Sequence, residues 1–346
     1  MKTLLVAACF AFFLLNGAYR EPAESRRCNC DDNDDSEQSS YKLFVFGDSY
    51  ADTGNLLNGD LNWYTRIWHE PFGMSDADHD NKPTGRCSDG LVQSDFLAKI
   101  LGLDDAPTPQ RMRRNEGVDL SSGINFASGG GALVGWNLDT QIDELRKLVR
   151  HGIIDKNLTK SVALVAVSDG SDYVDFPAEQ ADQDKLIRNV TDAIVDGVKQ
   201  LEDLGVDSVL VNLMPPIGCN PWNTRMYNYT KCDDEKNKIT SAHNKYLKEK
   251  LDDDESVLLL DLEKVFNKIV IPKTERLFQH RHVPCCETLE MDGGFCGQHD
   301  GDGNRNYTLC DKPDDYFFWD DSNPTQAGWK VVMGQLEGPI KDFLDI

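Results

Sequence analysis

The 346-residue sequence is poor in positive charge. It holds 36 lysines and arginines against 59 aspartates and glutamates, which gives a formal net charge of -23 at pH 7. Nucleic acids and anionic membrane surfaces carry negative charge themselves, so both would repel this chain. We therefore expect no nucleic-acid partner and no binding to anionic membranes, and we interpret the acidic excess as a well-solvated surface that favours a soluble monomer.

The sequence also lacks an apolar run long enough to cross a membrane, for which about 20 residues are needed. Its N-terminal apolar run, Leu4–Leu15, follows the positive Lys2 and precedes the small residues of Asn16–Ala18. These features are typical of a secretory signal peptide. We expect residues 1–18 to be such a signal, followed by an acidic disordered lead-in at 19–40. The mature protein is then secreted, either to the extracellular space or to a secretory-pathway lumen or vacuole.

Cysteines remain in odd number once the signal peptide is removed. Ten occur, and Cys9 lies in the signal, so nine remain. An oxidising compartment suits them, and an odd count leaves at least one thiol free or bonded to another molecule. Cys219 and Cys232 flank one loop and are expected to form a disulfide. At least one further bridge is expected in the loop-like stretch 271–315 from Cys286, Cys296 and Cys310.

Asn-x-Ser/Thr sequons support the same compartment. They occur at Asn157, Asn189, Asn228 and Asn306. In a chain with a signal peptide, four such acceptors favour glycosylation of the surface.

Several catalytic and cofactor motifs are absent. No Gly-x-Ser-x-Gly elbow occurs, which argues against an ordinary α/β-hydrolase, and no Cys/His spacing is typical of zinc. The glycine cluster Gly123–Ala132 lacks the Gly-x-Gly-x-x-Gly spacing of a dinucleotide loop. The stretch Asp300–Asn306 resembles the start of a calcium loop, but Arg305 stands where that loop needs glycine. We therefore expect neither a metal ion nor a cofactor.

Apolar runs alternate with helical patterns along the chain. Four runs are typical of strands buried on both faces, at 42–46, 161–167, 208–213 and 256–262. Apolar residues at helical spacing predict helices at about 92–101, 138–151, 181–204 and 233–251. This alternation predicts an α/β fold, with a parallel sheet covered by helices on both faces.

The first predicted strand leads directly to a serine. Gly47 follows the strand and permits a sharp turn, and Ser49 comes two residues later. In open α/β sheets, ligands bind outside the carboxyl ends of the strands. A serine placed there is a candidate nucleophile, although a serine at such a turn can equally cap the next helix.

The string Phe46–Asn55 around this serine resembles the first signature block of the GDSL esterase/lipase family, also called SGNH hydrolases, and within it the plant branch. The resemblance extends from about Lys42 to Phe343. It implies a single domain over 41–346 with a flavodoxin-like, doubly wound, three-layer α/β/α fold. It also implies that Ser49 is the nucleophile of ester hydrolysis, through an acyl-serine, on a small-molecule acyl ester or lipid.

Two further blocks carry implied roles. The glycine cluster resembles the second block of the family, whose oxyanion-hole glycine falls best on Gly129, with Gly130 as the alternative. The stretch Phe317–Gly328 resembles the closing block, which reads Trp-Asp-x-x-His-Pro-Thr in the family. Asp320 is therefore implied as the orienting acid.

The family pattern is broken at positions that bear on catalysis. Asp169 and Ser171 replace the glycine and the asparagine of the plant pattern Gly-x-Asn-Asp-Tyr. That asparagine donates to the oxyanion, and losing such a donor costs about 2.7–4 kcal/mol. Asn323 occupies the position of the histidine base, and an amide cannot take the serine proton near neutral pH. Loss of the base cost about 10⁶-fold in a studied serine protease, roughly 8 kcal/mol, so Asn323 is the larger change.

Another histidine could take over the role of the base. The sequence offers His69, His79, His151, His243, His280, His282 and His299. The last three lie in loops before the closing block, and loops can reach an active site. None of these three has an acid at the family's Asp-x-x-His spacing.

Three functions therefore stay open at this point. The first is an ester hydrolase with a weak or substituted base. The second is a catalytically inactive relative that binds a lipid, an ester or a glycan, and the third is an acyltransferase that uses Ser49. The retained Ser49 and Gly129 favour residual chemistry, whereas the changes at Ser171 and Asn323 favour the inactive relative.

Overall fold

The computed structural model describes residues 41–130, 136–271, 277–290 and 293–346. The expected signal peptide and acidic lead-in lie outside these residues, as do Cys9, Cys28 and Cys30. Within the described part of the chain, none of the helices combines the length and the apolar content that a membrane span requires.

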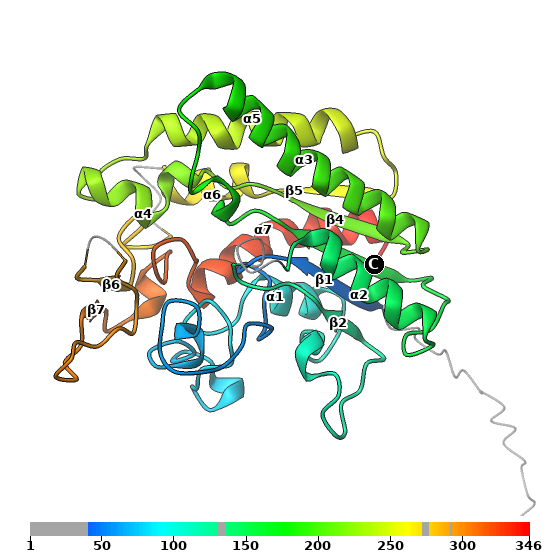
Figure 1. The fold of residues 1–346 in the computed structure, drawn as a ribbon, viewed down its shortest axis with the longest axis horizontal. Helices are drawn as coiled ribbons and strands as arrows, with labels where there is room; N and C mark the ends of the chain where they lie inside the picture. Colours follow the sequence, from blue (N-terminus) through cyan, green and yellow to red (C-terminus); the bar gives the residue numbers. More distant parts are fainter. Residues whose placement is uncertain (1–40, 131–135, 272–276, 291–292) are drawn as a thin grey trace, which may run out of the picture. The chain divides into compact units, whose positions relative to one another are not determined.

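A five-stranded parallel sheet forms the centre of the fold (Figure 1). Its strands lie in the order β2-β1-β3-β4-β5, which is the flavodoxin-like doubly wound order. This confirms the predicted fold class. The strands are β1 (Lys42–Gly47), β2 (Gly123–Asn125), β3 (Ser161–Ala166), β4 (Ser208–Leu213) and β5 (Val257–Asp261).

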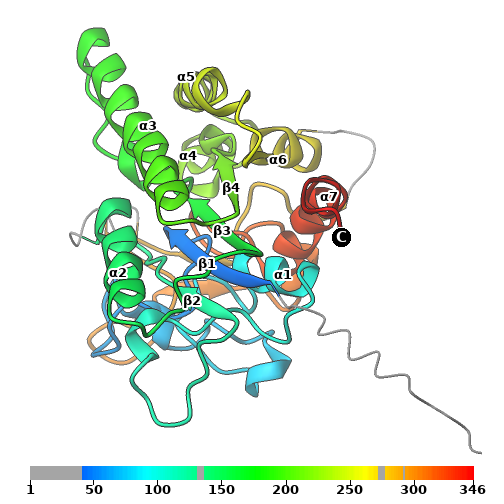
Figure 2. The ribbon, with the colours of Figure 1, turned by 90° about the vertical axis from the view of Figure 1, so that its right-hand side faces the viewer.

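Two layers of helices cover the sheet (Figure 2). One layer contains α1 (Gln93–Ile100), α6 (Leu262–Val270) and α7 (Gln326–Leu344). The other contains α2 (Leu138–Arg150), α3 (Gln180–Asp203) and α5 (Asp234–Leu251). Residues of β1 alternate between these layers, since Leu43 and Val45 join the core on the α1 side and Phe44 and Phe46 the core on the α2 side. Burial on both faces is why this strand has no polar interruption.

The four predicted helices match the structure to within one residue at each end. Side-chain caps account for two of the starts, because Asn137 accepts from the Thr140 N–H before α2 and Asp233 accepts from two backbone N–H groups before α5. The sequence did not predict the edge strand β2, the C-terminal helices α6 and α7, or the short α4 (Pro221–Thr224).

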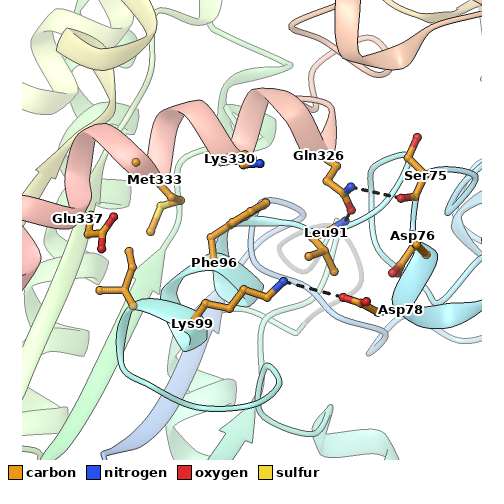
Figure 3. Close-up of a pocket in the computed structure, with 13 residues that line it drawn as sticks. Ser75, Asp76, Asp78, Leu91, Phe96, Lys99, Gln326, Lys330, Met333 and Glu337 are labelled. Carbon is orange, nitrogen blue, oxygen red and sulfur yellow. Dashed lines mark hydrogen bonds and ion pairs between the residues drawn. The ribbon is translucent and has the colours of Figure 1, made fainter.

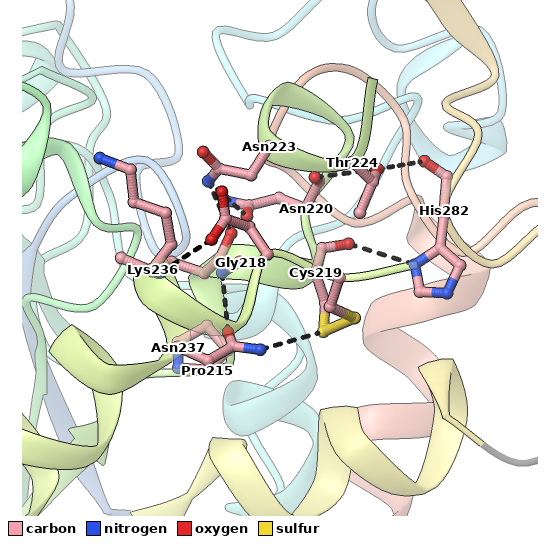
Figure 4. Close-up of a disulfide and its surroundings, with 12 residues drawn as sticks. Pro215, Gly218, Cys219, Asn220, Asn223, Thr224, Lys236, Asn237 and His282 are labelled. Atoms are coloured by element: carbon pink, nitrogen blue, oxygen red, sulfur yellow. Dashed lines mark hydrogen bonds between the residues drawn. A yellow bond between two sulfur atoms is a disulfide. The ribbon is translucent and has the colours of Figure 1, made fainter. Parts of the chain in front are cut away.

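Disulfides hold the irregular segments. Cys219 and Cys232 are bonded, which confirms the predicted bridge across the loop between β4 and α5 (Figure 4). The stretch before α7 contains two more, Cys285–Cys310 and Cys286–Cys296, beside a small antiparallel pair formed by β6 (Cys286–Thr288) and β7 (Tyr307–Leu309). The further bridge expected there is thus confirmed. Among the described cysteines, Cys87 is free, and it is buried.

Candidate active site

Ser49 lies just beyond the carboxyl end of β1. Gly47 ends that strand with a φ of 131°, and a Cβ on it would come within 2.1 Å of the Ala166 carbonyl oxygen in β3. Only glycine therefore allows β1 to approach β3 so closely at this point. Ser49 is 7% exposed as a residue, so it is largely shielded from water but not fully enclosed.

The hydroxyl of Ser49 begins a chain of hydrogen bonds to the closing block of the sequence. Ser49 Oγ lies 2.9 Å from Asn323 Oδ1, and Asn323 Nδ2 donates to Asp320 Oδ1 at 2.9 Å. Because the nitrogen of the amide is turned towards the carboxylate, its oxygen faces the serine. The order of hydroxyl, amide and carboxylate matches the hydroxyl, imidazole and carboxylate of a Ser-His-Asp triad. The amide can accept a hydrogen bond in this position, but it cannot take the proton.

Asp320 is anchored on its other oxygen by a cation. Arg66 Nη2 lies 3.5 Å from Asp320 Oδ2, and both side chains are almost fully buried. The guanidinium of Arg66 also stands over the ring of Trp63, 4.5 Å from the centroid. The aromatic segment after the serine block therefore holds the Asp320 carboxylate in place. Next to it, burial and the charge of Asp320 raise the pKa of Asp321 to about 7.

A second acceptor faces the serine hydroxyl. Ser49 Oγ lies 2.8 Å from Asp169 Oδ2. A hydroxyl has one proton to donate, so the Asp169 carboxylate and the Asn323 amide compete for it. Sequence reasoning identified Asp169 only as a substitute for a glycine and missed this contact. The signal available was its position, since Asp169 follows a buried strand that neighbours the strand leading to Ser49.

Asp48 ties the loop after β3 to the loop after β1. Its Oδ2 atom accepts hydrogen bonds from the backbone N–H groups of Ser168 and Asp169, and its Oδ1 accepts from the N–H of Tyr50. Burial and the neighbouring charge of Asp169 raise the pKa of Asp48 well above its usual range. These bonds fix the backbone on both sides of the contact between Ser49 and Asp169.

Gly129 lies beside the serine. A Cβ built on it would be 3.5 Å from Ser49 Cβ. Its N–H donates to Asp52 Oδ2 at 2.9 Å, so this group already has an acceptor. Over the described ranges, the backbone N–H of Ser49 has none. The neighbouring Gly130, the alternative oxyanion glycine, has a φ of 68°.

Ser171 begins a short 3-10 turn after β3. Its backbone N–H donates to Asp169 Oδ1 at 2.8 Å, and it lines a cavity of about 220 Å³ together with Asp48 and Gln141. Among the residues that the structure describes, no hydrogen bond joins Ser171 to Ser49. The structure therefore brings Ser49, Asn323, Asp320 and Gly129 together directly, and it connects Ser171 to them through Asp169.

None of the seven histidines, all of which are described, is hydrogen-bonded to Ser49. The three loop candidates have other contacts: His280 stacks on Tyr316, His282 Nδ1 lies 3.3 Å from the Cys219 carbonyl oxygen (Figure 4), and His299 meets the ring of Tyr307 edge-on. His243 is buried, with Nδ1 2.7 Å from the Tyr173 hydroxyl, and burial lowers its pKa to about 3.

A larger cavity lies away from the serine. It has a volume of about 530 Å³ between α1 and α7 and is lined by residues such as Phe96, Lys99, Lys330 and Met333 (Figure 3). Ser49, Asp169, Asp320 and Asn323 are not among its lining residues. Nor do the described residues include a group of three or more histidine, cysteine or acidic side chains arranged to hold a metal ion.

Comparison with known proteins gives consistent matches along the chain. The family model described as GDSL-like Lipase/Acylhydrolase matches residues 43–335. The relatives include two proteins of Arabidopsis thaliana. GDSL esterase/lipase At5g03600 is 33% identical, with 88% of this chain and 95% of the relative covered. GDSL esterase/lipase At5g03610 is 35% identical, with 85% of each chain covered. Among solved structures, a catalytic mutant of Axe2, an acetylxylan esterase from Geobacillus stearothermophilus, aligns at 14% identity with a TM-score of 0.39, over 88% of this chain and 94% of that one.

Proposed function

Since this chain belongs to the GDSL-like lipase/acylhydrolase family, we propose that it is a secreted, slow serine ester hydrolase with Ser49 as its nucleophile. The observation that carries the proposal is the hydrogen bond between Ser49 Oγ and Asn323 Oδ1. A serine hydroxyl, largely buried at the carboxyl end of a central strand, is held by the residue that occupies the position of the family's base. This contact supports Ser49 as the nucleophile, whereas the amide of Asn323 cannot activate it as an imidazole would.

The rate is limited by the step that removes the serine proton. General acid–base catalysis contributes typically 10²- to 10⁴-fold, and the amide of Asn323 contributes none of it. The contribution left to Asn323 is orientation of the serine. Its amide is held by Asp320, whose two carboxylate oxygens contact Asn323 Nδ2 and Arg66. We expect turnover well below that of a family member with histidine at this position.

Oxyanion stabilisation is assigned to Gly129 and Ser171. The nearness of Gly129 to Ser49 supports its part. Its N–H donates to Asp52. Stabilising an oxyanion therefore requires that Gly129 share or break this bond, or that the N–H of Ser49 contribute, which has no acceptor among the described residues. Ser171 can offer its hydroxyl or its N–H, and the latter donates to Asp169. Each well-placed donor is worth about 2.7–4 kcal/mol in the transition state.

The substrate is a small acyl ester or a lipid. Apolar side chains lie beside Gly129 and Gly130: a Cβ on Gly129 would lie 3.2 Å from Leu56 Cδ1, and one on Gly130 would meet the ring of Tyr64 at 3.9 Å. Apolar side chains at this place suit an acyl chain better than a charged group. Secretion is consistent with the three disulfides. It is also consistent with the sequons, of which Asn157, Asn189 and Asn228 are exposed and Asn306 is partly exposed.

A binding protein without turnover is the second candidate. It is favoured by two observations together: Asn323 cannot act as a base, and the N–H of Gly129 is already bonded to Asp52. An acyltransferase would form the same acyl-serine on Ser49 and pass the acyl group to an alcohol instead of water.

Steady-state hydrolysis of p-nitrophenyl esters, from acetate to long acyl chains, separates these functions. A slow hydrolase gives a low rate that Ser49→Ala removes. A binding protein gives no Ser49-dependent rate at any chain length but retains affinity for the ester. Acyl transfer appears as a new ester when an alcohol is added.

A further inference from the structure

We propose that Asp169 is the general base that activates Ser49. This inference rests on the proposed function and supplies the group that its chemistry otherwise lacks. Asp169 Oδ2 accepts the hydrogen bond of the Ser49 hydroxyl at 2.8 Å, which is within the distance over which a base takes a proton directly. Of the two acceptors that face this hydroxyl, the carboxylate is the one that can hold the proton after transfer.

The carboxylate is aimed at the serine by bonds to its other atoms. Asp169 Oδ1 accepts from the N–H of Ser171, and the N–H of Asp169 itself donates to the buried Asp48. The position follows from the sheet, because Gly47 at the end of β1 pairs with Ala166 at the end of β3. Ser49 and Asp169 follow these paired ends by two and three residues. Parallel strands in this register therefore bring the nucleophile and the acid side by side.

The chemistry balances with ester and water alone. The proton of Ser49 Oγ moves to Asp169 Oδ2 while Oγ bonds to the acyl carbon, and the carbonyl π pair moves onto the carbonyl oxygen. Collapse of this tetrahedral intermediate breaks the bond to the alkoxide, which takes the proton from Asp169. Water then attacks the acyl-serine and gives a proton to Asp169, which returns it to Oγ as the acid leaves.

The assignment accounts for slow rather than absent turnover. A carboxylate in this place supplies a proton acceptor at hydrogen-bond distance from Ser49, but it is not the imidazole that carries the proton in a Ser-His-Asp triad. Asn323 lies on the other side of the hydroxyl and competes for the same proton, with its own amide fixed by the bond to Asp320.

The same experiment must also test whether Asp169 slows the reaction. A negative charge beside Ser49 could also oppose the oxyanion that forms on the substrate, in which case Asp169 would slow the reaction. Asp169→Asn is the matched variant, since an amide keeps an acceptor for the Ser171 N–H but cannot take the proton. Asp169→Gly removes the carboxylate and leaves room for a small acid. Asp172→Asn is the control for charge, because Asp172 is a partly buried carboxyl whose charge is coupled to that of Asp169 and which has no hydrogen bond to Ser49 in the described structure.

The measurement is the rate of Ser49 acylation and of turnover with p-nitrophenyl acetate, using the full mature chain. We expect Asp169→Asn to slow acylation by roughly 10²- to 10⁴-fold, whereas Asp172→Asn should keep a rate near that of the unmodified protein. Formate, but not chloride, should restore part of the acylation rate of Asp169→Gly. An unchanged or faster rate in Asp169→Asn, or a faster Asp169→Gly without formate, would overturn the inference. The proposed function is tested separately by Ser49→Ala. If Ser49 is acylated equally fast with and without Asp169, the hydrolase stands and the base assignment fails. If the unmodified protein is not acylated at all, both fail.

Discussion

Asn323 holds its carboxamide oxygen 2.9 Å from the hydroxyl of Ser49 while its nitrogen donates to Asp320. The two residues are 274 positions apart in the chain, and the fold brings them into the arrangement that the proposed function expects of a nucleophile and its partner. All the connections of a triad are present, but the central member has no basic nitrogen. The site thus keeps the geometry of a hydrolase and lacks its usual proton acceptor.

Restoring the histidine should restore the rate. Asn323→His places an imidazole where Asp320 Oδ1 can accept from one ring nitrogen and the other can face Ser49 Oγ. We expect hydrolysis of p-nitrophenyl acetate to rise, and the full contribution of a positioned base, roughly 10²- to 10⁴-fold, should be seen when Asn323→His is compared with the unmodified residue in the Asp169→Asn background. The variant should also gain an acid limb in its pH–rate profile, because a histidine base loses activity once it is protonated.

Two further variants test how that gain arises. Asp320→Asn in the Asn323→His background should remove most of it, because the orienting carboxylate is lost. Ser171→Asn added to Asn323→His should raise the rate again by a smaller factor if the introduced amide gains an oxyanion contact. A folded Asn323→His protein with no increase on any acyl chain length would instead favour the binding protein.

Asp321 should reduce stability above neutral pH. Burial raises its pKa from 3.8 to about 7, so between these values the folded state holds a proton that the unfolded state has released. Stability from this group is therefore lost as the pH rises through that window. Asp321→Asn should be more stable than the unmodified protein at pH 8, on the order of 2 kcal/mol because the side chain is only partly buried. At pH 4 the variant and the unmodified protein should be nearly equally stable. Equal urea midpoints for the two proteins at pH 8 would contradict the assignment.

His243 should reduce stability at acidic pH. Burial lowers its pKa from 6.5 to about 3, so between these values the unfolded state binds a proton that the folded state does not. Stability from this group is present above pH 6.5 and is lost as the pH falls towards 3. His243→Gln does not titrate in this range, so its free energy of unfolding should depend less steeply on pH, by on the order of 4 kcal/mol over the whole window. Identical slopes from urea unfolding between pH 4 and 7 would rule out this role.

The bridge between Cys219 and Cys232 should stabilise the fold. It links positions separated by 13 residues, and closing a loop of about this length is worth about 3 kcal/mol in the chain-entropy account. The double variant Cys219→Ser and Cys232→Ser should therefore unfold at lower denaturant concentration. The equivalent pair Cys286→Ser and Cys296→Ser, with a separation of 10, is the matched comparison. If removal of the first bridge left the midpoint unchanged, the loop after β4 would be held by its other contacts, such as the bond from the Gly218 N–H to Asn237 Oδ1.

Long, regular elements could be predicted from the sequence, and short ones could not. The helix at 138–150 has apolar residues at helical spacing, which predicts it nearly to the residue. Strand β2 contains three residues, Gly123–Asn125, and has no pattern of its own. It exists because β1 offers a free edge, with Leu43 paired to Gly123. Helix α6 follows β5 without a break. Its N-cap residue Asp261, which accepts from the Lys264 N–H, is also the last residue of the strand, so no separate turn segment marks the boundary.

Residues of the site could be predicted only where they lie within a recognisable sequence motif. Ser49 and Asn323 came from signature blocks, and the structure joins them directly. The contact with Asp169 depends instead on the register of β1 against β3, with Gly47 opposite Ala166. A sequence motif does not indicate how two strands are aligned in a sheet. The bond from the Gly129 N–H to Asp52 is similar, since a glycine cluster indicates backbone N–H groups without indicating which acceptor they reach.

The most direct test of the account is covalent labelling of the serine. The mature protein is incubated with a fluorophosphonate probe that reacts with activated serine nucleophiles, and the modified peptide is mapped by mass spectrometry. We predict stoichiometric but slow labelling on Ser49, lost in Ser49→Ala and accelerated in Asn323→His. Absence of label on Ser49 in both the unmodified protein and Asn323→His, with both folded, would contradict the claim that this chain is a serine ester hydrolase.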